Sequence, residues 1–315
     1  MIHFRLYKTG DEHDIISLSR KVFPQFVIDI SVWNWLYNKN KKNIFLAFDG
    51  ETLIGHWAYL NKSIQVKSKI FLSGLTLGAM VHPDYQGQKI FSRLGMYALS
   101  HISNRSIDLL YGFPNDKSLH VHEKIFFFKE IKTFSLFKKE VFIDKQYAHG
   151  KSSCLYFEKS NTLKEINDLS DHVKLRKNTA YLHYRYLCSP HNKYFIYKIY
   201  NRLRYIGFLV FKKYMRDGNN HMQLIDMDIK KKYIDNIFFK EIYFFWNFIA
   251  RRYNTVFLST WGQQLDMPED FIINEFNFRK DDSKNFHLCL KSIKSTMKCT
   301  CFQPWLIRMG DTELF

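Results

Sequence analysis

A strand, a loop and a helix follow one another in the stretch Val81-His-Pro-Asp-Tyr-Gln-Gly-Gln-Lys-Ile-Phe-Ser-Arg-Leu94. The proline ends the strand, and apolar residues recur at helical spacing from Ile90 onward. A helix that begins after such a loop offers free backbone N–H groups at the positive end of its dipole, where phosphate binds well. Gly87 allows a close backbone approach, and Lys89 and Arg93 add positive charge. The stretch is therefore a candidate anion site, although many turns of this kind bind nothing.

The residues on either side of this stretch predict a mixed α/β domain. Segments of helical apolar spacing alternate with short apolar runs, and Asp49-Gly50 is typical of a hairpin turn. Before the loop we expect strands at residues 3–7, 43–48, 52–60 and 75–81, and helices at 11–23 and around 33–37. After the loop we expect a helix at 90–102, a strand at 107–111, a helix at 120–128 and a strand at 134–142. This order indicates an α/β fold with an α+β mixed sheet and not a helical bundle.

The second half of the chain repeats the first half in weaker form. The matching pairs are Val32-Trp-Asn-Trp-Leu-Tyr37 with Tyr181-Leu-His-Tyr-Arg-Tyr186, Gly55 with Gly207, and Lys124-Ile-Phe-Phe127 with Glu275-Phe-Asn-Phe278. The spacing between the glycine and the aromatic segment is nearly the same in both halves. The repeat favours a duplicated fold, with domains at 1–147 and 155–315 and a linker at 148–153. Chance similarity between two aromatic-rich stretches is the alternative.

Composition and charge narrow the class of protein. The chain has 315 residues, 46% of them hydrophobic and 17% aromatic, so it can form two globular cores. Its net charge of +17 comes from lysines spread along the sequence, which indicates a solvated surface more than nucleic-acid binding. The absence of a signal peptide and of a membrane span predicts a cytoplasmic protein. The five cysteines form no pair of Cys-x-x-Cys motifs, so we expect no metal, and Cys299-Thr-Cys301 is the remaining metal or redox candidate.

The loop resembles the coenzyme A loop of GNAT N-acetyltransferases, whose pattern is Gln/Arg-x-x-Gly-x-Gly/Ala. Gln86 matches the first position of that pattern, and Gly87 is the glycine that often follows it. Lys89 and Phe91 stand where the family has two small residues, so the chain departs from the pattern there. The order of elements from about residue 3 to 145 also resembles the GNAT fold. The resemblance therefore implies a GNAT acyl-CoA N-acyltransferase fold, which the repeat would duplicate.

The resemblance also implies where acetyl-CoA or another acyl-CoA binds. In the family, the strand before the loop and the strand after the next helix diverge, and the pantetheine arm lies in the gap. The first strand would pair with the pantetheine amides through Leu77, Ala79 and Val81. The pyrophosphate would lie over Gln86, Gly87, Gln88, Lys89, Ile90, Phe91 and Ser92. Asn115 would orient the coenzyme or substrate, or would simply cap a helix.

Acyl transfer to an amine needs a base for the amine and an acid for the departing thiolate. In the family the acid is commonly a tyrosine shortly before a Gly-Phe pair, and the resemblance places His122 there, with His120 nearby. His56 is the first choice for the base, because it follows a glycine on a strand whose face could line the acceptor site. Glu51 and His82 are the alternatives. A core or surface position is the simpler interpretation of each histidine.

These features together predict an N-acyltransferase that moves an acetyl or short acyl group from acyl-CoA to an amine. The resemblance to two-lobed GNAT-like proteins suggests an amino sugar of surface-polysaccharide synthesis as the acceptor. Lys230-Lys-Lys-Tyr233 contains no glycine, so we expect the second half to be a degenerate GNAT-like domain that shapes the acceptor cleft. The alternatives are a non-catalytic GNAT-like binding protein and a Fem-type aminoacyl transferase, whose long helical arm is not evident in the sequence.

Overall fold

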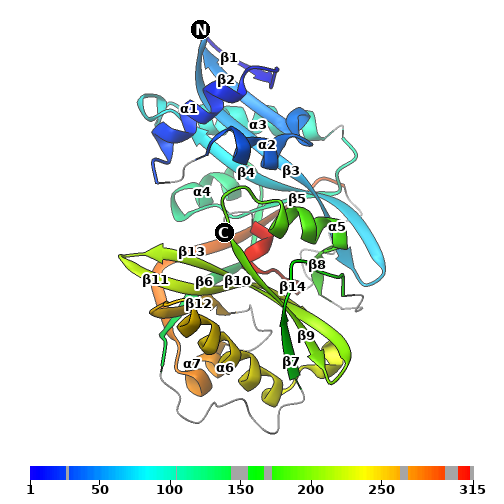
Figure 1. Cartoon of the computed structure of the whole chain (residues 1–315). Helices are drawn as coiled ribbons and strands as arrows, with labels where there is room; N and C mark the ends of the chain where they lie inside the picture. The colour runs from blue at the N-terminus through cyan, green and yellow to red at the C-terminus, as the bar shows by residue number, and fades with distance from the viewer. Residues whose placement is uncertain are drawn as a thin grey trace. The chain divides into compact units, whose positions relative to one another are not determined.

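The structure is a computed structural model of the chain (Figure 1). It describes all residues except 26–27, 104, 143–154, 167–171, 263–268, 295–303 and 313–315, and it leaves out the side chains of 271 and 282–284. The expected linker at 148–153 and Cys299-Thr-Cys301 lie outside the described residues. Within the described part of the chain, no helix is long and apolar enough to cross a membrane.

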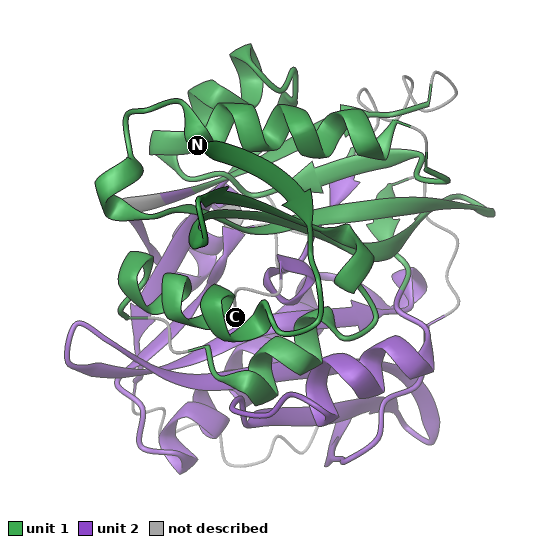
Figure 2. Ribbon diagram, turned by 90° about the horizontal axis from the view of Figure 1, so that it is seen from above, with its two compact units in different colours: residues 1–133, 171–176, 286–304 green, residues 134–170, 177–285, 305–315 purple. Residues whose placement is uncertain are grey.

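The chain folds into two compact units, which Figure 2 shows in different colours. Unit 1 comprises Met1–Thr133, Asp171–Arg176 and Phe286–Pro304, and unit 2 comprises Phe134–Ser170, Lys177–Asn285 and Trp305–Phe315. Neither unit is continuous in sequence, because the strands β6 (Lys129–Glu140) and β13 (Arg279–Ser292) are each divided between the units. Neither unit coincides with the contiguous domains expected at 1–147 and 155–315. Each unit includes a strand from the other half of the sequence: β13 pairs with β5 in unit 1, and β6 pairs with β12 in unit 2.

Unit 1 contains a mixed sheet in the order β1-β2-β3-β4-β5-β13, in which only β4 and β5 run parallel. Its elements from the first half of the chain are β1 (Ile2–Leu6), α1 (Glu12–Val22), α2 (Ile30–Tyr37), η1 (Lys41–Asn43), β2 (Ile44–Asp49), β3 (Thr52–Val66), β4 (Lys69–Val81), η2 (Pro83–Tyr85), α3 (Ile90–Ile102), β5 (Leu109–Gly112) and α4 (Asp116–Lys124). The short strand β8 (Val173–Leu175) pairs with the end of β3. The expected helix at 120–128 is wrong in its bounds, because α4 begins four residues earlier.

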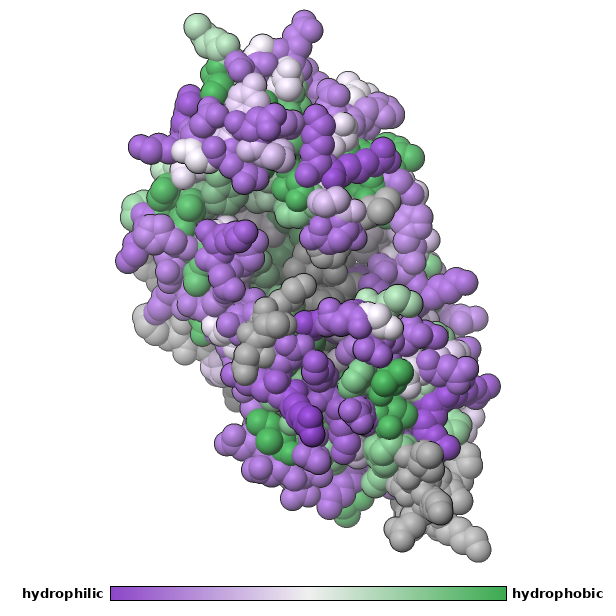
Figure 3. All heavy atoms as spheres, turned by 90° about the vertical axis from the view of Figure 1, so that its left-hand side faces the viewer, coloured by the Kyte–Doolittle hydropathy of each residue, from purple (hydrophilic) through white to green (hydrophobic). Residues whose placement is uncertain are grey.

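Strand β2 shows how the sequence builds this sheet. All five residues from 44 to 48 are buried, because helices cover both faces of the sheet. Ile44, Leu46 and Phe48 pack with α1 and α2, whereas Phe45 and Ala47 pack with α3 on the other face. The outer surface is largely hydrophilic on the face drawn in Figure 3, with apolar residues scattered in small groups. A continuous apolar run in this sequence therefore indicates a strand buried on both sides.

Gly95 lies in α3 where the ring of Phe126 takes the space of a side chain. A Cβ atom at Gly95 would lie 2.2 Å from Cζ of Phe126, which is fully buried. Alanine usually stabilises a helix over glycine by about 1 kcal/mol. Here we expect Gly95→Ala to lower the free energy of unfolding by about 1–3 kcal/mol, because the ring must move. Urea unfolding checks this, with the half-exposed Met96→Ala as control, and a stabilised Gly95→Ala variant would contradict it.

In unit 2 the paired strands follow the order β6-β12-β11-β10-β9-β7, in which only β11 and β12 run parallel. Its further elements are β7 (Leu155–Lys159), α5 (Thr179–Leu182), a π-helical turn η3 (His183–Leu187), β9 (Tyr194–Asn201), β10 (Arg204–Arg216), β11 (Asn219–Ile229), η4 (Lys231–Tyr233), α6 (Asn236–Arg252), β12 (Phe257–Trp261), α7 (Glu269–Phe276), β14 (Trp305–Leu306) and η7 (Met309–Thr312).

The element order of unit 2 repeats that of unit 1. The series β10-β11-α6-β12-α7 corresponds to β3-β4-α3-β5-α4. Helices α4 and α7 also end alike: the Phe128 N–H donates to the His122 carbonyl oxygen at 2.8 Å, and the Phe278 N–H donates to that of Ile272 at 3.4 Å. The residue before each donor has a positive φ. These matches support a duplicated fold. They pair Phe128 with Phe278, whereas the sequence repeat aligned Phe127 with Phe278.

Candidate functional site

The loop between β4 and α3 has the backbone shape of an anion-binding turn. After η2, Gly87 and Lys89 have positive φ angles of 79° and 60°. Gly87 adopts this conformation without strain, and a Cβ atom there would have no heavy atom within 4 Å. Lys89, the residue before α3, adopts the left-handed region at a cost of about 1–2 kcal/mol. The position where the resemblance expects a small residue thus has the conformation that glycine favours.

Open backbone N–H groups gather where α3 begins. No side chain caps this helix, and among the described residues the N–H groups of 87–92 donate to no protein acceptor. The first bond of the helix runs from the Arg93 N–H to the Lys89 carbonyl oxygen at 3.0 Å. The Arg93 guanidinium lies 5.2 Å from the centre of the Phe4 ring. Open N–H groups, the helix dipole and two cationic side chains together favour a bound anion.

The other side chains of the loop support its shape. Gln86 Nε2 donates to the carbonyl oxygen of Val81 at the end of β4, at 3.3 Å, and Gln88 Nε2 donates to that of Asp84 in the loop, at 3.1 Å. Ile90 is buried, whereas Phe91 and Ser92 are half-buried. The two glutamines therefore hold the loop in place, and the groups open to a ligand are the backbone amides and the cations.

Strand β5 ends before β4 does, so the last part of β4 before the loop extends beyond their pairing. Their parallel pairing ends with Thr76 opposite Gly112, where β5 also ends. Beyond that pair, the described residues give β4 no partner strand on its β5 side. Leu77 and Ala79 in this part of β4 are half-buried, and Val81 is buried. The structure thus brings the residues expected to contact pantetheine to an unpaired strand edge next to the loop.

His56 lies in the interior of unit 1. Its side chain is 1% exposed, its Nδ1 donates to the Gly78 carbonyl oxygen at 2.6 Å, and its Nε2 has no hydrogen-bond partner among the described residues. Burial lowers the pKa of His56 to about 4, so the ring is neutral at pH 7. Gly78 lies at the bulge of β4 with a φ of 68°, and a Cβ atom there would lie 2.7 Å from the Tyr37 hydroxyl oxygen. His56 therefore supports the bulge from inside the core.

His122 lies on α4 among aromatic rings. Its side chain is 5% exposed, and its ring centroid lies 5.9, 5.4 and 5.5 Å from those of Phe91, Phe126 and Phe128. Burial lowers the pKa of His122, and Nδ1 donates to the Ser118 carbonyl oxygen at 2.9 Å. The neutral ring therefore carries its proton on Nδ1. Nε2 has a lone pair and forms no hydrogen bond to a described residue.

Asn115 caps α4. Its Oδ1 accepts a hydrogen bond from the Ser118 N–H at 3.0 Å, and this cap is the reason why the helix begins at Asp116. Sequence reasoning did not single out Ser118, whose carbonyl oxygen selects the tautomer of His122. The four-residue spacing between Ser118 and His122 was the signal available in the sequence, because residues four apart lie one turn apart on a helix.

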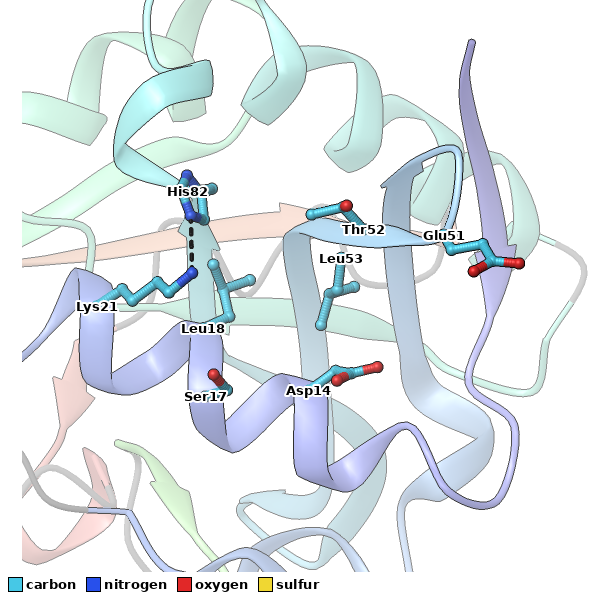
Figure 4. Close-up of a pocket in the computed structure, with 8 residues that line it drawn as sticks. All are labelled: Asp14, Ser17, Leu18, Lys21, Glu51, Thr52, Leu53 and His82. Atoms are coloured by element: carbon cyan, nitrogen blue, oxygen red, sulfur yellow. Dashed lines mark hydrogen bonds between the residues drawn. The ribbon is translucent and has the colours of Figure 1, made fainter.

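A pocket of about 260 Å³ adjoins the same loop (Figure 4). It is lined by Asp14, Ser17, Leu18, Lys21, Glu51, Thr52, Leu53 and His82. Glu51 and His82, the two alternative bases, lie at opposite ends of this pocket in Figure 4, and both nitrogens of His82 have partners. Nε2 lies 3.2 Å from Lys21 Nζ, and Nδ1 accepts from the Asp84 N–H at 3.3 Å. His82 thus helps to hold the loop, as the glutamines do.

The corresponding parts of unit 2 differ in two ways. The start of α6 is already capped, because Asp235 Oδ1 accepts from the Phe238 N–H at 2.7 Å. A carboxylate at this helix start opposes the binding of a second anion. The position of His122 is taken by the buried Ile272. The uncapped helix start and the histidine on the helix after β5 therefore occur together in unit 1.

Comparisons with known proteins agree with this geometry. Residues 3–122 match a family model described as an acetyltransferase (GNAT) domain, and no curated protein sequence matches the chain significantly. The fold is similar to the solved structure of a GCN5-related N-acetyltransferase from Anabaena variabilis ATCC 29413, with a TM-score of 0.66 and 11% identity over 93% of this chain and 73% of that one. It is also similar to a conserved protein of unknown function, a probable N-acyltransferase, from Enterococcus faecalis V583, with a TM-score of 0.65 and 10% identity over 93% of this chain and 73% of that one. A GCN5-related N-acetyltransferase from Kribbella flavida has a TM-score of 0.60 and 9% identity over 93% of this chain and 71% of that one.

At such low identities the solved structures show the fold alone, and they cover nearly the whole chain. The domain match includes β4, the loop, α3 and α4 as far as His122. The expected fold is therefore confirmed, and residues 3–122 of the chain match the GNAT acetyltransferase domain.

Proposed function

We propose that the chain is an acyl-CoA-dependent N-acyltransferase that transfers an acetyl or short acyl group to an amine. The observation that carries this proposal is the set of open N–H groups at 87–92, together with the cationic Lys89 and Arg93, beside the unpaired edge of β4. The pyrophosphate of the coenzyme would lie on these groups. The pantetheine arm would follow residues 77–81, where β4 has backbone groups without a partner strand.

His122 carries the proton in this proposal. Its Nε2 lone pair accepts a proton from the amine nitrogen as that nitrogen bonds to the acyl carbon. His122 then gives the proton to the sulfur as the carbon–sulfur bond breaks, so the products are an amide and a free thiol. The bond from Nδ1 to the Ser118 carbonyl oxygen keeps the ring in the tautomer that this transfer needs. From the sequence we expected His122 to act only as an acid. In this mechanism it acts first as a base and then as an acid.

His56 has a supporting role in this mechanism. It is buried, it is neutral at pH 7, and its donor nitrogen is bonded to Gly78. The His56 Nε2 atom is also fully enclosed, so an incoming amine cannot reach its lone pair. We therefore assign the base function to His122 and the support of the β4 bulge to His56.

For the finer identity of the substrates we propose acetyl-CoA as donor and an amino sugar as the first class of acceptor to test. The amino sugar is supported by the resemblance to two-lobed GNAT-like proteins. We also propose a cytoplasmic location.

Acetyl-CoA binding can be measured as a rise in stability. At a concentration of about 100 times Kd, we expect acetyl-CoA to add about 2.7 kcal/mol to the free energy of unfolding. Lys89→Glu places a negative charge at the start of α3 and should raise Kd by about tenfold or more. Lys69→Glu, an exposed change at the opposite end of β4, is the matched control and should leave Kd unchanged. No stabilisation of the wild-type chain by millimolar acetyl-CoA would overturn the proposed function.

A non-catalytic binding protein is the second candidate. The burial of His122 and its contact with Phe91, which stands where the family has a small residue, favour this alternative. Release of free thiol from acetyl-CoA in the presence of a panel of amines separates the two functions. Acetyl-CoA binding without thiol release for any amine would support the binding protein.

A further inference from the structure

Three ionisable side chains meet at the start of α4, and one of them comes from the C-terminal part of the sequence. His287 lies on β13, Asp116 is the first residue of α4, and Glu130 lies on β6. His287 Nε2 lies 2.7 Å from Asp116 Oδ1, and His287 Nδ1 lies 2.7 Å from Glu130 Oε1. Thr133 Oγ1 also donates to Glu130 Oε1, at 2.6 Å. His287 therefore joins the helix to a neighbouring strand.

The hydrogen bonds determine the protonation state of His287. A carboxylate accepts hydrogen bonds and cannot donate them, so both ring nitrogens must carry a proton, which makes the ring a cation. Burial alone would lower the pKa of His287, but the hydrogen bonds to Asp116 and Glu130 outweigh it and raise the pKa. Among the residues that the structure describes, the charged groups that face the ring are these two carboxylates. Cys289 on the same strand stays neutral, because burial raises the pKa of its thiol to about 12.

Strand β13 holds the far end of α4 as well. Lys291 lies on the same face of the strand as His287, four residues further on, and its Nζ donates to the Phe126 carbonyl oxygen at 2.7 Å. Between the two, Cys289 is fully buried in the core that also contains Phe126. One face of β13 thus contacts the beginning of α4 through His287 and the segment just after its end through Lys291.

We propose that His287 and Lys291 are positioning residues that fix the helix bearing His122, supplied to unit 1 by the C-terminal half of the chain. This inference rests on the proposed function. A displacement of about 1 Å in a reacting group can lower a rate by about 100-fold, so both ends of the helix matter for the reach of Nε2. Deprotonation of His287 removes one of its two N–H donors and turns a lone pair toward a carboxylate, which loosens the start of α4.

The sign of the pH dependence follows from the raised pKa. The cation and both of its bonds are present below the unfolded-state pKa of histidine, about 6.5, and are lost as the pH rises through the higher folded-state value. Wild-type kcat should therefore fall on the alkaline side.

The test uses the full-length chain and three variants, with kcat and KM measured between pH 6 and 9. We expect His287→Gln to lower kcat by about 10- to 100-fold, to remove the alkaline fall and to leave the acetyl-CoA Kd unchanged. Asp116→Asn keeps the ring but removes one carboxylate charge, so the alkaline fall should move to lower pH. Lys294→Gln is the control. It breaks the exposed ion pair between Lys294 Nζ and Asp108 Oδ1, which lie 2.9 Å apart and do not contact α4.

Hydrogen exchange of the α4 amides, measured on the same samples, makes the outcome independent of turnover. Faster exchange in α4 but not in α3 of His287→Gln supports the positioning role. This holds even if the wild-type chain shows no acyl transfer, because that result contradicts the proposed function alone. An alkaline fall that is the same in wild type, His287→Gln and Asp116→Asn overturns the inference. Unchanged exchange of α4 in His287→Gln also overturns it.

Discussion

His122→Ala should lower kcat by about 10²–10⁴-fold, the range usual for loss of a general acid or base. The substitution removes the Nε2 lone pair that we propose for proton transfer. It leaves the loop at 87–92 intact, so the Kd of acetyl-CoA should change little. Steady-state kinetics with saturating donor and acceptor, together with a direct binding measurement, check both parts. The measurement requires that chemistry limits the rate.

The pH profile gives a second test of His122. Because burial lowers its pKa, the neutral ring needed as a base should persist into acid, and kcat should fall only below the ordinary histidine range near about 6.5. His120→Ala is the matched control, since His120 lies on the same helix but is exposed. It should keep wild-type kcat. An unchanged kcat in His122→Ala would remove His122 from the mechanism.

The loop and α3 were predictable from the sequence because their determinants are local. A proline that ends a strand, a glycine in the loop and apolar residues at helical spacing all lie within 81–94. The conformation of Lys89 was not predictable, because a lysine rarely adopts a positive φ. Asn115 was open to two interpretations, and its side chain caps α4.

The burial of His56 was not evident from its strand. A glycine and a histidine on a hairpin suggest an open face, but β3 is buried on both sides from residue 53 to 60 because α1 and α3 cover its two faces. Its donor bond to Gly78 depends on a bulge in the next strand, which no local pattern indicates.

The contacts of β13 were the least predictable part of the site. His287 meets Asp116 and Glu130 across 171 and 157 positions of sequence. No periodicity near His287 identifies such partners, and the duplication suggested that each half would keep its own strands. Long-range strand exchange is a property of the whole fold, so local patterns do not contain it.

Lys177→Met should destabilise unit 2 by about 3–5 kcal/mol, because it leaves two carboxylates buried without their cation. Lys177 Nζ lies 2.6 Å from Asp226 Oδ1 and 2.9 Å from Asp311 Oδ1, and the three side chains are 8%, 0% and 1% exposed. The Tyr186 hydroxyl donates to the other oxygen of Asp226. Burial raises the pKa of Asp311 even with the lysine present. The loss of free energy of unfolding in Lys177→Met, relative to wild type, should therefore be largest at pH 7.

The pH dependence of this deficit distinguishes charge burial from lost packing. In Lys177→Met the folded-state pKa of Asp311, which burial already raises, moves further above the unfolded value of about 3.9. The folded state then binds protons more readily than the unfolded state, so the difference from wild type should shrink as the pH falls from 7 toward 4. Urea unfolding at several pH values measures it. Lys240→Met, which breaks the exposed pair with Glu275 at 3.9 Å, should change stability by less than about 0.5 kcal/mol at any of these pH values. A loss in Lys177→Met that is small, or equally large at pH 4 and pH 7, would show that the lysine is not compensating two buried charges.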